Sequence, residues 1–451
     1  MSYLRIIKTA LIRRTPLGTY LCMPHGFKLE TFLPIIEIDK NVEMVLNLCD
    51  GTRTREDILA QLSAESGEPV PEIEEGFDGL VEYLMQEGIL QWTDTPSYIL
   101  PIHNRQRPFS ITLDLTSACN LSCPYCSAEA GKAHPEELTL DDLVPFVEQA
   151  KQLKPSPIAM NGGEPLLKKD MVLYMLEQLS PIKEIALTIF TNGTLITKDY
   201  AQQLYDAGLR ICRVSVDGHT EALHDSIRGK GNFEKTIQGI RYLRELGIHV
   251  DAIAVISTIN YEYLHEIRNF FHHLADSSSV VPVAPYGRAF GTELLLPPDE
   301  EFDVKMSSSQ TKKIQLNVSP RNRCNVGETI YIAANGDIFP CFYMQFPEFK
   351  AGNIRENSLS EVFEGTLLQS LMGLTVDEID ECKDCEIRYY CGGGCRGMAY
   401  RGYHSVYCPD PHNCEANKLL AQKILEDGEE NTKKLMEELL ESTRALQMVR
   451  S

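Results

Sequence analysis

The stretch Phe109-Ser-Ile-Thr-Leu-Asp-Leu-Thr-Ser-Ala-Cys-Asn-Leu-Ser-Cys-Pro-Tyr-Cys126 joins a short apolar run to a loop with three cysteines. The run Phe109–Leu115 has the length of a buried strand, and Cys119, Cys123 and Cys126 follow it directly. Three thiolates can bind three irons of a four-iron cubane and leave the fourth iron open to another ligand. The alternative is zinc, but a structural zinc ion takes four ligands and this loop supplies three. The spacing therefore favours an iron–sulfur cluster.

Short apolar runs alternate with amphipathic helical patterns over the next two hundred or so residues. Such a succession of β-α units is typical of a parallel α/β sheet. Six units are fewer than the eight of a closed barrel, so we expect an open, partial (β/α)6 TIM barrel. The predicted strands are Phe109–Leu115, Pro157–Met160, Glu184–Phe190, Arg210–Val216, His249–Ile256 and Val280–Ala284.

Polar motifs follow three of these strands, at the end where parallel sheets bind ligands. After the second strand, Gly162 and Gly163 allow backbone to approach a ligand closely, and the carboxylate of Glu164 can pair with an ammonium group. Asn192 follows the third strand, in a Thr-Asn-Gly sequence that a plain turn would also explain.

The end of the fourth strand carries Ser215 and Asp217, and Arg228 comes eleven residues after Asp217. A guanidinium forms a planar fork that suits a ligand carboxylate. A surface ion pair is the alternative use for Arg228.

The Cys-x3-Cys-x2-Cys spacing, with Tyr125 before the last cysteine, resembles the signature of the radical S-adenosylmethionine (SAM) superfamily. The resemblance implies a [4Fe-4S] cluster whose open iron binds the methionine part of SAM and whose reduction yields a 5′-deoxyadenosyl radical. It also implies that the Gly-Gly-Glu motif meets the methionine amino group and that Ser215 and Arg228 contact its carboxylate. No residue is marked as a catalytic acid or base. The candidate cofactor-binding residues are Tyr125, Gly162, Gly163, Glu164, Asn192, Ser215, Asp217 and Arg228.

A second group of eight cysteines lies towards the end of the chain, at 324, 341, 382, 385, 391, 395, 408 and 414. On spacing alone a pair of zinc ribbons would compete, since Cys-x2-Cys pairs also bind zinc. The pattern resembles the SPASM domain, which holds two auxiliary [4Fe-4S] clusters. The resemblance implies that Cys324, Cys341 and Cys395 bind the nearer cluster and that Cys382, Cys385, Cys391 and a late cysteine bind the outer one.

The late cysteine is predicted to be Cys414, with Cys408 as the alternative, although the closing segment is one residue longer than usual. If Cys408 joins the nearer cluster, both auxiliary clusters are closed. Otherwise the nearer cluster keeps an open iron. With the loop at 119–126, the chain is predicted to carry three [4Fe-4S] clusters and SAM.

Composition sets the context for these motifs. The chain has 451 residues and 14 cysteines, and clustered cysteines in a reducing compartment usually bind metal. Cys22, Cys49 and Cys212 lie in apolar runs and are predicted to be core residues. The net charge of −21 argues against a nucleic-acid partner. Without a membrane-spanning run or a signal-peptide core, a cytoplasmic protein is expected.

Residues 1–95 form a predicted separate domain, followed by a linker at 96–108. Thr54 and Asp57 have the spacing of a capping box at the start of a helix. The stretch Leu46–Thr54 resembles the winged-helix domain that binds leader peptides in maturases of ribosomally made peptides; a DNA-binding winged helix is the alternative. The remaining predicted domains are a partial barrel at 109–318, a SPASM domain at 319–415 and a C-terminal helix at 416–451. The SPASM region is expected to bury few apolar groups and to be held together by metal.

Together the resemblances imply a radical SAM enzyme that modifies a precursor peptide, with a thioether crosslink as the first choice of product. Carbon–carbon crosslinking, epimerisation or decarboxylation, or oxidation of a folded protein, are the enzymatic alternatives. A zinc-stapled peptide-binding protein is the non-enzymatic one. A flavodoxin or ferredoxin-type electron donor is expected as a second partner.

Overall fold

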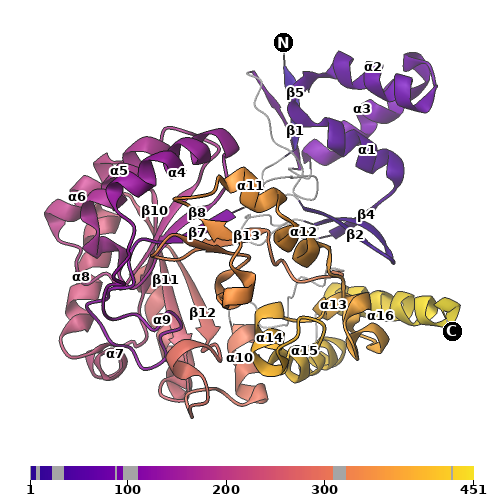
Figure 1. Ribbon diagram of the computed structural model, residues 1–451. Coiled ribbons are helices and arrows are strands. Elements are labelled where there is room, and N and C mark those ends of the chain that lie inside the picture. Colours follow the sequence, from indigo (N-terminus) through magenta and orange to yellow (C-terminus); the bar gives the residue numbers. More distant parts are fainter. Residues whose placement is uncertain are drawn as a thin grey trace.

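The computed structural model describes residues 2–6, 11–22, 35–86, 89–94, 110–307, 321–427 and 430–450. A small N-terminal α+β unit lies beside a central sheet with surrounding helices, and the cysteine-rich region covers the open side of that sheet (Figure 1). The predicted linker at 96–108 lies outside the described residues.

The central sheet has nine strands in the order β12-β11-β10-β9-β8-β7-β13-β14-β15. The six from β7 to β12 are parallel and adjacent in sequence order, so the predicted open partial barrel is confirmed. Their bounds are β7 Ser110–Asp114, β8 Ile158–Asn161, β9 Leu187–Thr191, β10 Ile211–Ser215, β11 His249–Ile256 and β12 Ser277–Pro282.

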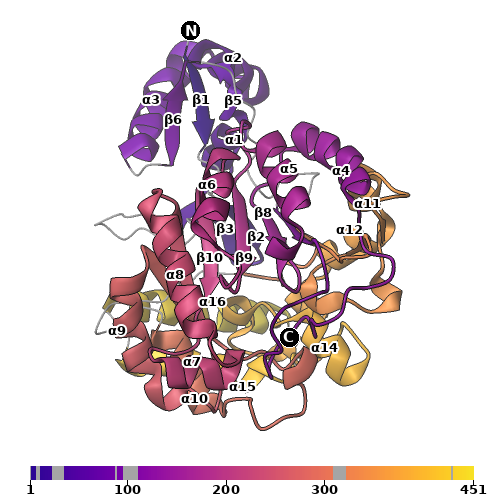
Figure 2. The same cartoon turned by 90° about the vertical axis from the view of Figure 1, so that its left-hand side faces the viewer.

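Helices pack against the outer face of this sheet (Figures 1 and 2). Alternate strand residues such as Ile111 and Leu113 are fully buried and form one core with helix residues such as Phe146. Thr139 and Asp142 form a capping box at the start of α4 (Leu140–Leu153), in which the side chain of each accepts from the backbone amide of the other. The helices are α4 Leu140–Leu153, α5 Lys169–Leu179, α6 Lys198–Asp206, α7 Glu221–Arg228, α8 Asn232–Glu245, α9 Leu264–Leu274 and α10 Pro298–Ser307.

The cysteine-rich region continues the barrel sheet. Strand β13 (Thr329–Ile332) pairs in parallel with β7, and Ile330 lies opposite Ile111. The prediction that this region buries few apolar groups is wrong, because Ile330, Ile332 and Phe363 belong to the main core. Its apolar residues sit on elements too short to show a period. These elements are β14 Asp337–Phe339, β15 Gly352–Asn353, α11 Leu359–Glu364, α12 Thr366–Gly373, α13 Arg388–Cys391 and α14 Arg396–Tyr403.

The chain ends in two helices rather than the single predicted helix. Helix α15 (Asn413–Asp427) and helix α16 (Glu430–Arg450) pack with Tyr389 and Tyr390 in a separate core. Leu17, from the N-terminal unit, packs against the same core. The C-terminal helices therefore bridge the cysteine-rich region and the N-terminal unit.

The N-terminal unit has its own core and two small antiparallel sheets, β5-β1-β6 and β2-β3-β4. The predicted capping box of Thr54 and Asp57 is confirmed at the start of α2. None of the described helices is long and apolar enough to cross a membrane. The bounds are β1 Tyr3–Ile6, β2 Leu11–Thr15, β3 Gly18–Cys22, β4 Ile35–Ile38, β5 Asp50–Thr54 and β6 Leu90–Thr93, with α1 Lys40–Leu48, α2 Arg55–Ser66 and α3 Val70–Gln86.

Candidate active site

A cavity of about 290 Å³ lies at the carboxyl ends of the barrel strands. The three cysteines of the first loop line it, together with six of the predicted cofactor-binding residues: Tyr125, Gly162, Gly163, Asn192, Ser215 and Arg228. Glu164 and Asp217 do not line the cavity but are fully buried behind it. The structure thus brings together motifs that are spread over more than a hundred residues of sequence.

The three thiols of the loop are close enough to affect one another's ionisation. Burial raises the pKa of Cys119, the amide N–H of Leu121 lowers it, and negative charge on Cys123 or Cys126 raises it further. Burial also raises the pKa of Cys123, whereas the guanidinium of Arg228 lowers it. Metal binding requires thiolates, so a nearby arginine suits this donor set. Three thiols that line one cavity fit a cluster with one uncoordinated iron.

Gly162 and Gly163 hold the cysteine loop in place. The amide of Gly163 donates to the carbonyl oxygen of Thr116 at 2.7 Å. A Cβ atom at position 163 would lie 2.1 Å from the carbonyl oxygen of Ala118, and one at position 162 would lie 2.3 Å from that of Thr116. Only glycine permits so close a contact. The close approach expected toward a ligand is thus, in this structure, toward the backbone of the cysteine loop.

Glu164, which follows β8, is hydrogen-bonded to the end of β9. Its Oε1 accepts from the hydroxyl of Thr191 at 2.7 Å, and its Oε2 accepts from the amide of Asn192 at 2.8 Å. Burial raises the pKa of Glu164 to about 6, although these hydrogen bonds oppose the change. Its carboxylate is therefore already held by the protein, and its direct contacts support the cavity wall.

Asp217 and Arg228 form a buried ion pair between Asp217 Oδ2 and Arg228 Nε. The hydroxyl of Tyr125 donates to the same carboxylate oxygen, and Arg228 Nη2 lies 3.1 Å from that hydroxyl. The other oxygen of Asp217 accepts from the amide of Val255 at 2.9 Å. Asp217 thereby fixes the direction in which Arg228 faces the cavity, which excludes the surface ion pair as its role.

Asn192 reaches back to the cysteine loop, where its Nδ2 donates to Asn120 Oδ1 at 2.9 Å. Its own Oδ1 accepts from the amide and hydroxyl of Thr194. The plain turn that was the alternative explanation of Thr191-Asn-Gly is therefore present. Through Asn192 this turn also contacts the cysteine loop. Ser215, at the end of β10, is half-buried in the cavity wall.

Several residues of the site were not predicted. Arg288 donates from Nε to the carbonyl oxygen of Cys123 at 2.9 Å and from Nη1 to that of Ala130 at 2.8 Å. Phe342 and Tyr343, next to Cys341, also line the cavity. The position of Arg288 just after the sixth strand was the available signal, because ligand sites gather at strand ends.

The later cysteines fall into two groups. Burial raises the pKa of Cys341, and negative charge on Cys395 and Cys324 raises it further. In this first group of Cys324, Cys341 and Cys395, the first two cysteines pack beside Met344 and Phe349.

The second group contains Cys382, Cys385, Cys391 and Cys414. Burial raises the pKa of Cys382 to about 12, and negative charge on Cys391, Cys414 and Cys385 contributes in the same direction. The interactions that define the two groups do not include Cys408, whose carbonyl oxygen accepts from Arg396 at 2.8 Å.

That these two groups hold two auxiliary clusters stays a prediction of the SPASM resemblance. Among the described residues, no three His, Cys, Asp or Glu side chains are arranged to hold a single metal ion. A cubane binds its thiolates through different irons, so its cysteines need not converge on one point.

Two further cysteines, Cys49 and Cys212, lie in the apolar core, as predicted. The side chain of Cys22 lies outside the described residues.

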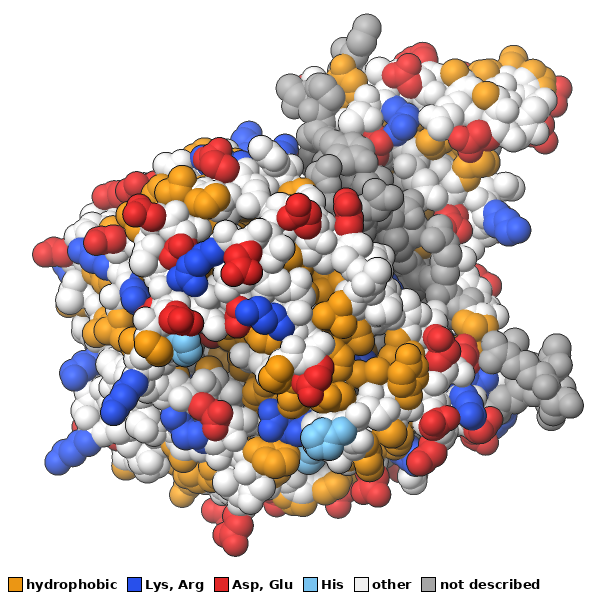
Figure 3. All heavy atoms as spheres, viewed as in Figure 1, with side chains coloured by type: hydrophobic (Ala, Val, Ile, Leu, Met, Phe, Trp, Pro, Cys, Tyr) orange, Lys and Arg blue, Asp and Glu red, His pale blue; other side chains and the backbone are white. Residues whose placement is uncertain are grey.

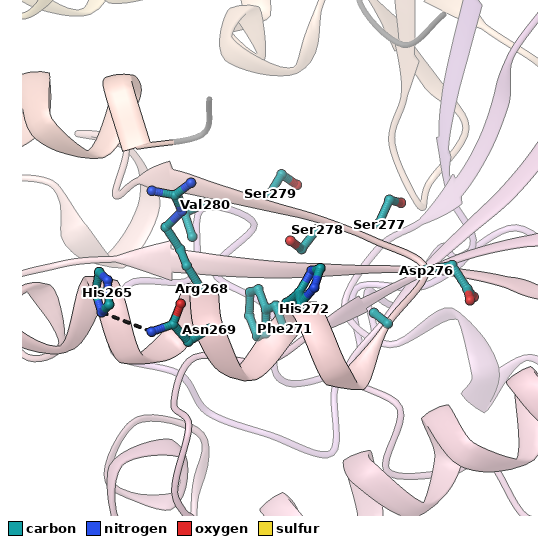
Figure 4. Close-up of a pocket in the computed structure, with 11 residues that line it drawn as sticks. His265, Arg268, Asn269, Phe271, His272, Asp276, Ser277, Ser278, Ser279 and Val280 are labelled. Atoms are coloured by element: carbon teal, nitrogen blue, oxygen red, sulfur yellow. Dashed lines mark hydrogen bonds between the residues drawn. The ribbon is translucent and has the colours of Figure 1, made fainter. Parts of the chain in front are cut away.

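A larger cavity of about 550 Å³ lies elsewhere, between α9 and the edge strand β12 (Figure 4). Its wall contains Arg268, His272 and the run Ser277–Ser279. His265 and Asn269 bond to each other at its rim at 3.0 Å. No cysteine lines this cavity, so the candidate active site is placed in the smaller one, where the thiols are.

Two family models match the chain. The radical SAM superfamily matches residues 113–271, and the iron–sulfur cluster-binding SPASM domain matches residues 324–386. Among curated relatives, an AdoMet-dependent heme synthase of Nitratidesulfovibrio vulgaris is 27% identical over 64% of this chain and 88% of its own length. The mycofactocin maturase MftC of Mycobacterium tuberculosis is 24% identical over 67% of this chain and 82% of its own.

Solved structures share the fold. Streptococcus suis SuiB bound to precursor peptide SuiA aligns with a TM-score of 0.58 and 19% identity, covering 91% of this chain and all of SuiB. Native anSMEcpe with bound AdoMet aligns with a TM-score of 0.56 and 17% identity, covering 74% of this chain and 99% of its own. The chain therefore contains a radical SAM domain that is followed by a SPASM iron–sulfur cluster-binding domain.

Proposed function

We propose that the protein is a radical SAM maturase that installs a crosslink, most simply a thioether, in a ribosomally made precursor peptide. The observation that carries the proposal is the extent of the likeness to SuiB, which was solved with a precursor peptide. The alignment with SuiB covers 91% of this chain, whereas residues 110–451 make up only about three quarters of it. The alignment therefore extends into the N-terminal unit. MftC, also a maturase by name, is similar in sequence.

The proposed cofactors are SAM and three [4Fe-4S] clusters. Cys119, Cys123 and Cys126 hold the first, whose reduction in the presence of SAM supplies a 5′-deoxyadenosyl radical. Cys324, Cys341 and Cys395 hold the nearer auxiliary cluster, and the outer cysteine group Cys382, Cys385, Cys391 and Cys414 holds the other. A reduced flavodoxin or ferredoxin-type protein is the proposed electron donor.

The residues of the cavity have proposed roles in binding and orientation. Arg228, held by Asp217 and Tyr125, binds the carboxylate of the methionine portion, because a fixed guanidinium recognises carboxylates well. Ser215 contacts the same group. The Gly162–Gly163 backbone and Asn192 keep the cysteine loop against the cavity. Phe342 and Tyr343 cover the cavity from the SPASM side and exclude water from the radical.

Residues 1–95 are the proposed leader-binding domain, joined by the linker 96–108 to the barrel at 109–318, the SPASM domain at 319–415 and the C-terminal helices. Strands β2 and β4 are the edges of one of its small sheets, and a leader can bind by adding a strand to such an edge. The acidic net charge of −21 disfavours DNA as its ligand.

The similarity to AdoMet-dependent heme synthases supports a second candidate, a heme synthase-like activity. That relative matches 64% of the chain, whereas SuiB covers 91%. The additional coverage favours the peptide maturase. Epimerisation, carbon–carbon crosslinking and oxidation of a folded protein remain outcomes of the test below, and so does a zinc-stapled protein without catalysis.

The test is an anaerobic reaction of reconstituted protein with SAM, a reductant and the short peptide encoded beside its gene. We expect about twelve irons per chain, from three clusters of four, formation of 5′-deoxyadenosine, and a peptide lighter by two hydrogens. A thioether is identified by loss of one reactive thiol, and unchanged mass with deuterium uptake would show epimerisation instead. Binding is followed separately by the fluorescence of Trp92, the only tryptophan, which is 37% exposed on β6. Zinc in place of iron, or no change in the peptide, would refute the proposal.

A further inference from the structure

A buried arginine without a carboxylate partner lies beside the outer cysteine group. Arg396 is 1% exposed, and its guanidinium donates to the carbonyl oxygens of Val406 at 2.7 Å, Cys408 at 2.8 Å and Gly393. Its Nε has no hydrogen-bond partner among the described residues. The three acceptors are neutral, so none of them balances the charge.

A buried guanidinium needs an anion nearby. Arginine stays protonated in proteins, and a charge removed from water is costly unless an opposite charge compensates it. The Nη2 of Arg396 donates to the carbonyl oxygen of Gly393, two residues after Cys391 of the outer group. The missing countercharge is therefore on the side of the cysteines. Four thiolates with a cubane carry net negative charge and supply it.

A second arginine lies on the same group. The side chain of Arg321 covers Gly392, where a Cβ atom would lie 2.8 Å from its Cγ and Cδ. Its Nε is buried and has no hydrogen-bond partner within the described part of the chain. Gly392 follows Cys391 directly, so Arg321 lies beside a cysteine of the outer group.

One buried carboxylate, Asp410, lies close to cysteines of both groups. It is 2% exposed, and its Oδ2 accepts from the amide of Cys395 at 2.8 Å. Its backbone carbonyl oxygen accepts from the amide of Cys414 at 3.3 Å. The two arginines, in contrast, both contact the glycines that follow Cys391.

We infer that Arg396, with Arg321 beside it, is the built-in counter-cation of an anionic cluster on the outer cysteine group and raises its reduction potential. Net charge and hydrogen bonding around a cluster set its potential. The inference rests on the proposed cofactor content. Arg396 and Arg321 are positioning residues in this account, because they act on the cluster and touch no substrate.

The test is a potentiometric titration of the reconstituted full chain, followed by electron paramagnetic resonance. A Cys414→Ala variant, which removes the outer cluster, assigns its signal. Arg396→Gln is expected to move the midpoint potential of the outer cluster to a more negative value and to leave the other two unchanged. Arg396→Lys keeps the charge and is expected to shift it less. Arg321→Gln is expected to shift the midpoint potential of the outer cluster in the same direction. This variant replaces Arg396→Gln in the test if Arg396→Gln does not retain iron.

Lys383→Gln is the matched control. Lys383 follows Cys382 directly but is 51% exposed and pairs with Asp380 at 3.3 Å, so water screens its charge and no comparable shift is expected. Unchanged potentials in Arg396→Gln and Arg321→Gln at full iron content would overturn the inference and leave the proposed function standing. Wild-type protein without iron on the outer group would overturn both.

Discussion

Arg288 donates from Nε to the carbonyl oxygen of Cys123 across a distance of 2.9 Å. The amide of Arg288 also donates to the carbonyl oxygen of Cys126 at 3.1 Å. These bonds join the segment after the last barrel strand, β12, to the loop after the first, β7, although the two strands are not neighbours in the sheet. The side chain and the amide of Arg288 thus join the two sides of the open barrel at the end where the cavity lies.

Replacement of Arg288 by Gln tests this connection. It removes two side-chain hydrogen bonds from a charged donor, so we expect the unfolding free energy to fall by about 2 kcal/mol, with faster loss of iron from the first cluster. Thermal unfolding and timed iron release to a chelator measure the two effects. Arg241→Gln is the control, because Arg241 is 57% exposed and its ion pair with Glu234 spans 3.8 Å. Equal behaviour of the two variants would contradict the role of Arg288.

Gly163→Ala is expected to abolish binding of the first cluster. The added Cβ would lie 2.1 Å from the carbonyl oxygen of Ala118, a backbone atom that cannot move without moving the cysteine loop. Gly131→Ala in the same loop region meets nothing within 4 Å and is expected to be neutral. Iron content and 5′-deoxyadenosine formation are the measurements. A Gly163→Ala protein with wild-type values for both would refute the close-contact argument.

Asp217→Asn is expected to weaken SAM binding about tenfold or more, a loss near 1.4 kcal/mol, because Arg228 loses the carboxylate that orients it. Removing one partner of a buried ion pair also costs about 3 kcal/mol of stability. Equilibrium binding of SAM and thermal unfolding separate these effects. Asp251→Asn breaks the 3.3 Å pair with the 45%-exposed Arg213 and is expected to leave SAM binding unchanged. Unaltered SAM affinity in Asp217→Asn would show that Arg228 is held by other contacts.

Replacement of Cys414 is predicted to remove iron from the protein, whereas replacement of Cys408 is not. Cys414 interacts with the outer cysteine group, whereas Cys408 does not belong to either group. We expect Cys414→Ala to lose about four irons and Cys408→Ala to keep about twelve, since a cubane holds four irons. Iron analysis with Mössbauer spectroscopy distinguishes them. Loss of iron in Cys408→Ala would instead assign Cys408 as a ligand of the nearer cluster.

Stability is expected to depend on pH through Asp114, at the end of β7. Its Oδ2 accepts from the hydroxyl of Tyr331 at 2.6 Å, while its Oδ1 has no partner among the described residues. Burial raises the pKa of Asp114 from its ordinary value of 3.8 to about 7, although Tyr331 opposes this. Below about pH 4 both folded and unfolded chains bind the proton. Between about pH 4 and 7 only the folded chain does, so the unfolding free energy falls as pH rises, by about 4 kcal/mol in total.

Asp114→Asn isolates this contribution, because asparagine keeps the shape and cannot ionise. Unfolding of both proteins is measured from pH 5 to pH 8. The variant is expected to gain stability relative to wild type as pH rises. Parallel curves over this range would show that Asp114 is ionised in the folded protein.

Much of the barrel and of the cavity could be predicted from sequence, because both depend on local patterns. The six strands, the helix cap at Thr54 and the cysteine loop each occupy a short, continuous stretch. Six of the eight expected cofactor-binding residues face one cavity because parallel strands place their ends at one edge of the sheet. The assignment of the later cysteines to two clusters comes from family resemblance and stays a prediction.

The contacts between distant side chains could not be predicted. The pairing of Asp217 with Arg228 and Tyr125, and the contact of Arg288 with the cysteine loop, depend on directions that spacing does not reveal. Glu164 was expected to face a ligand, but its carboxylate is turned to Thr191 and Asn192. The cysteine-rich region was taken as poor in apolar burial, because Ile330 and Phe363 lie on elements too short to show a period.

The parallel pairing of β13 with β7 has a consequence for how the protein is built. Backbone hydrogen bonds make the strand that begins the radical SAM domain and a strand of the SPASM domain neighbours in one continuous sheet. The two cannot be expressed as independent halves, since cutting the chain between them would leave an unsatisfied edge in the middle of that sheet. They also cannot drift apart, so the separation between the cysteine loop at 119–126 and the later cysteines is a rigid property of the fold.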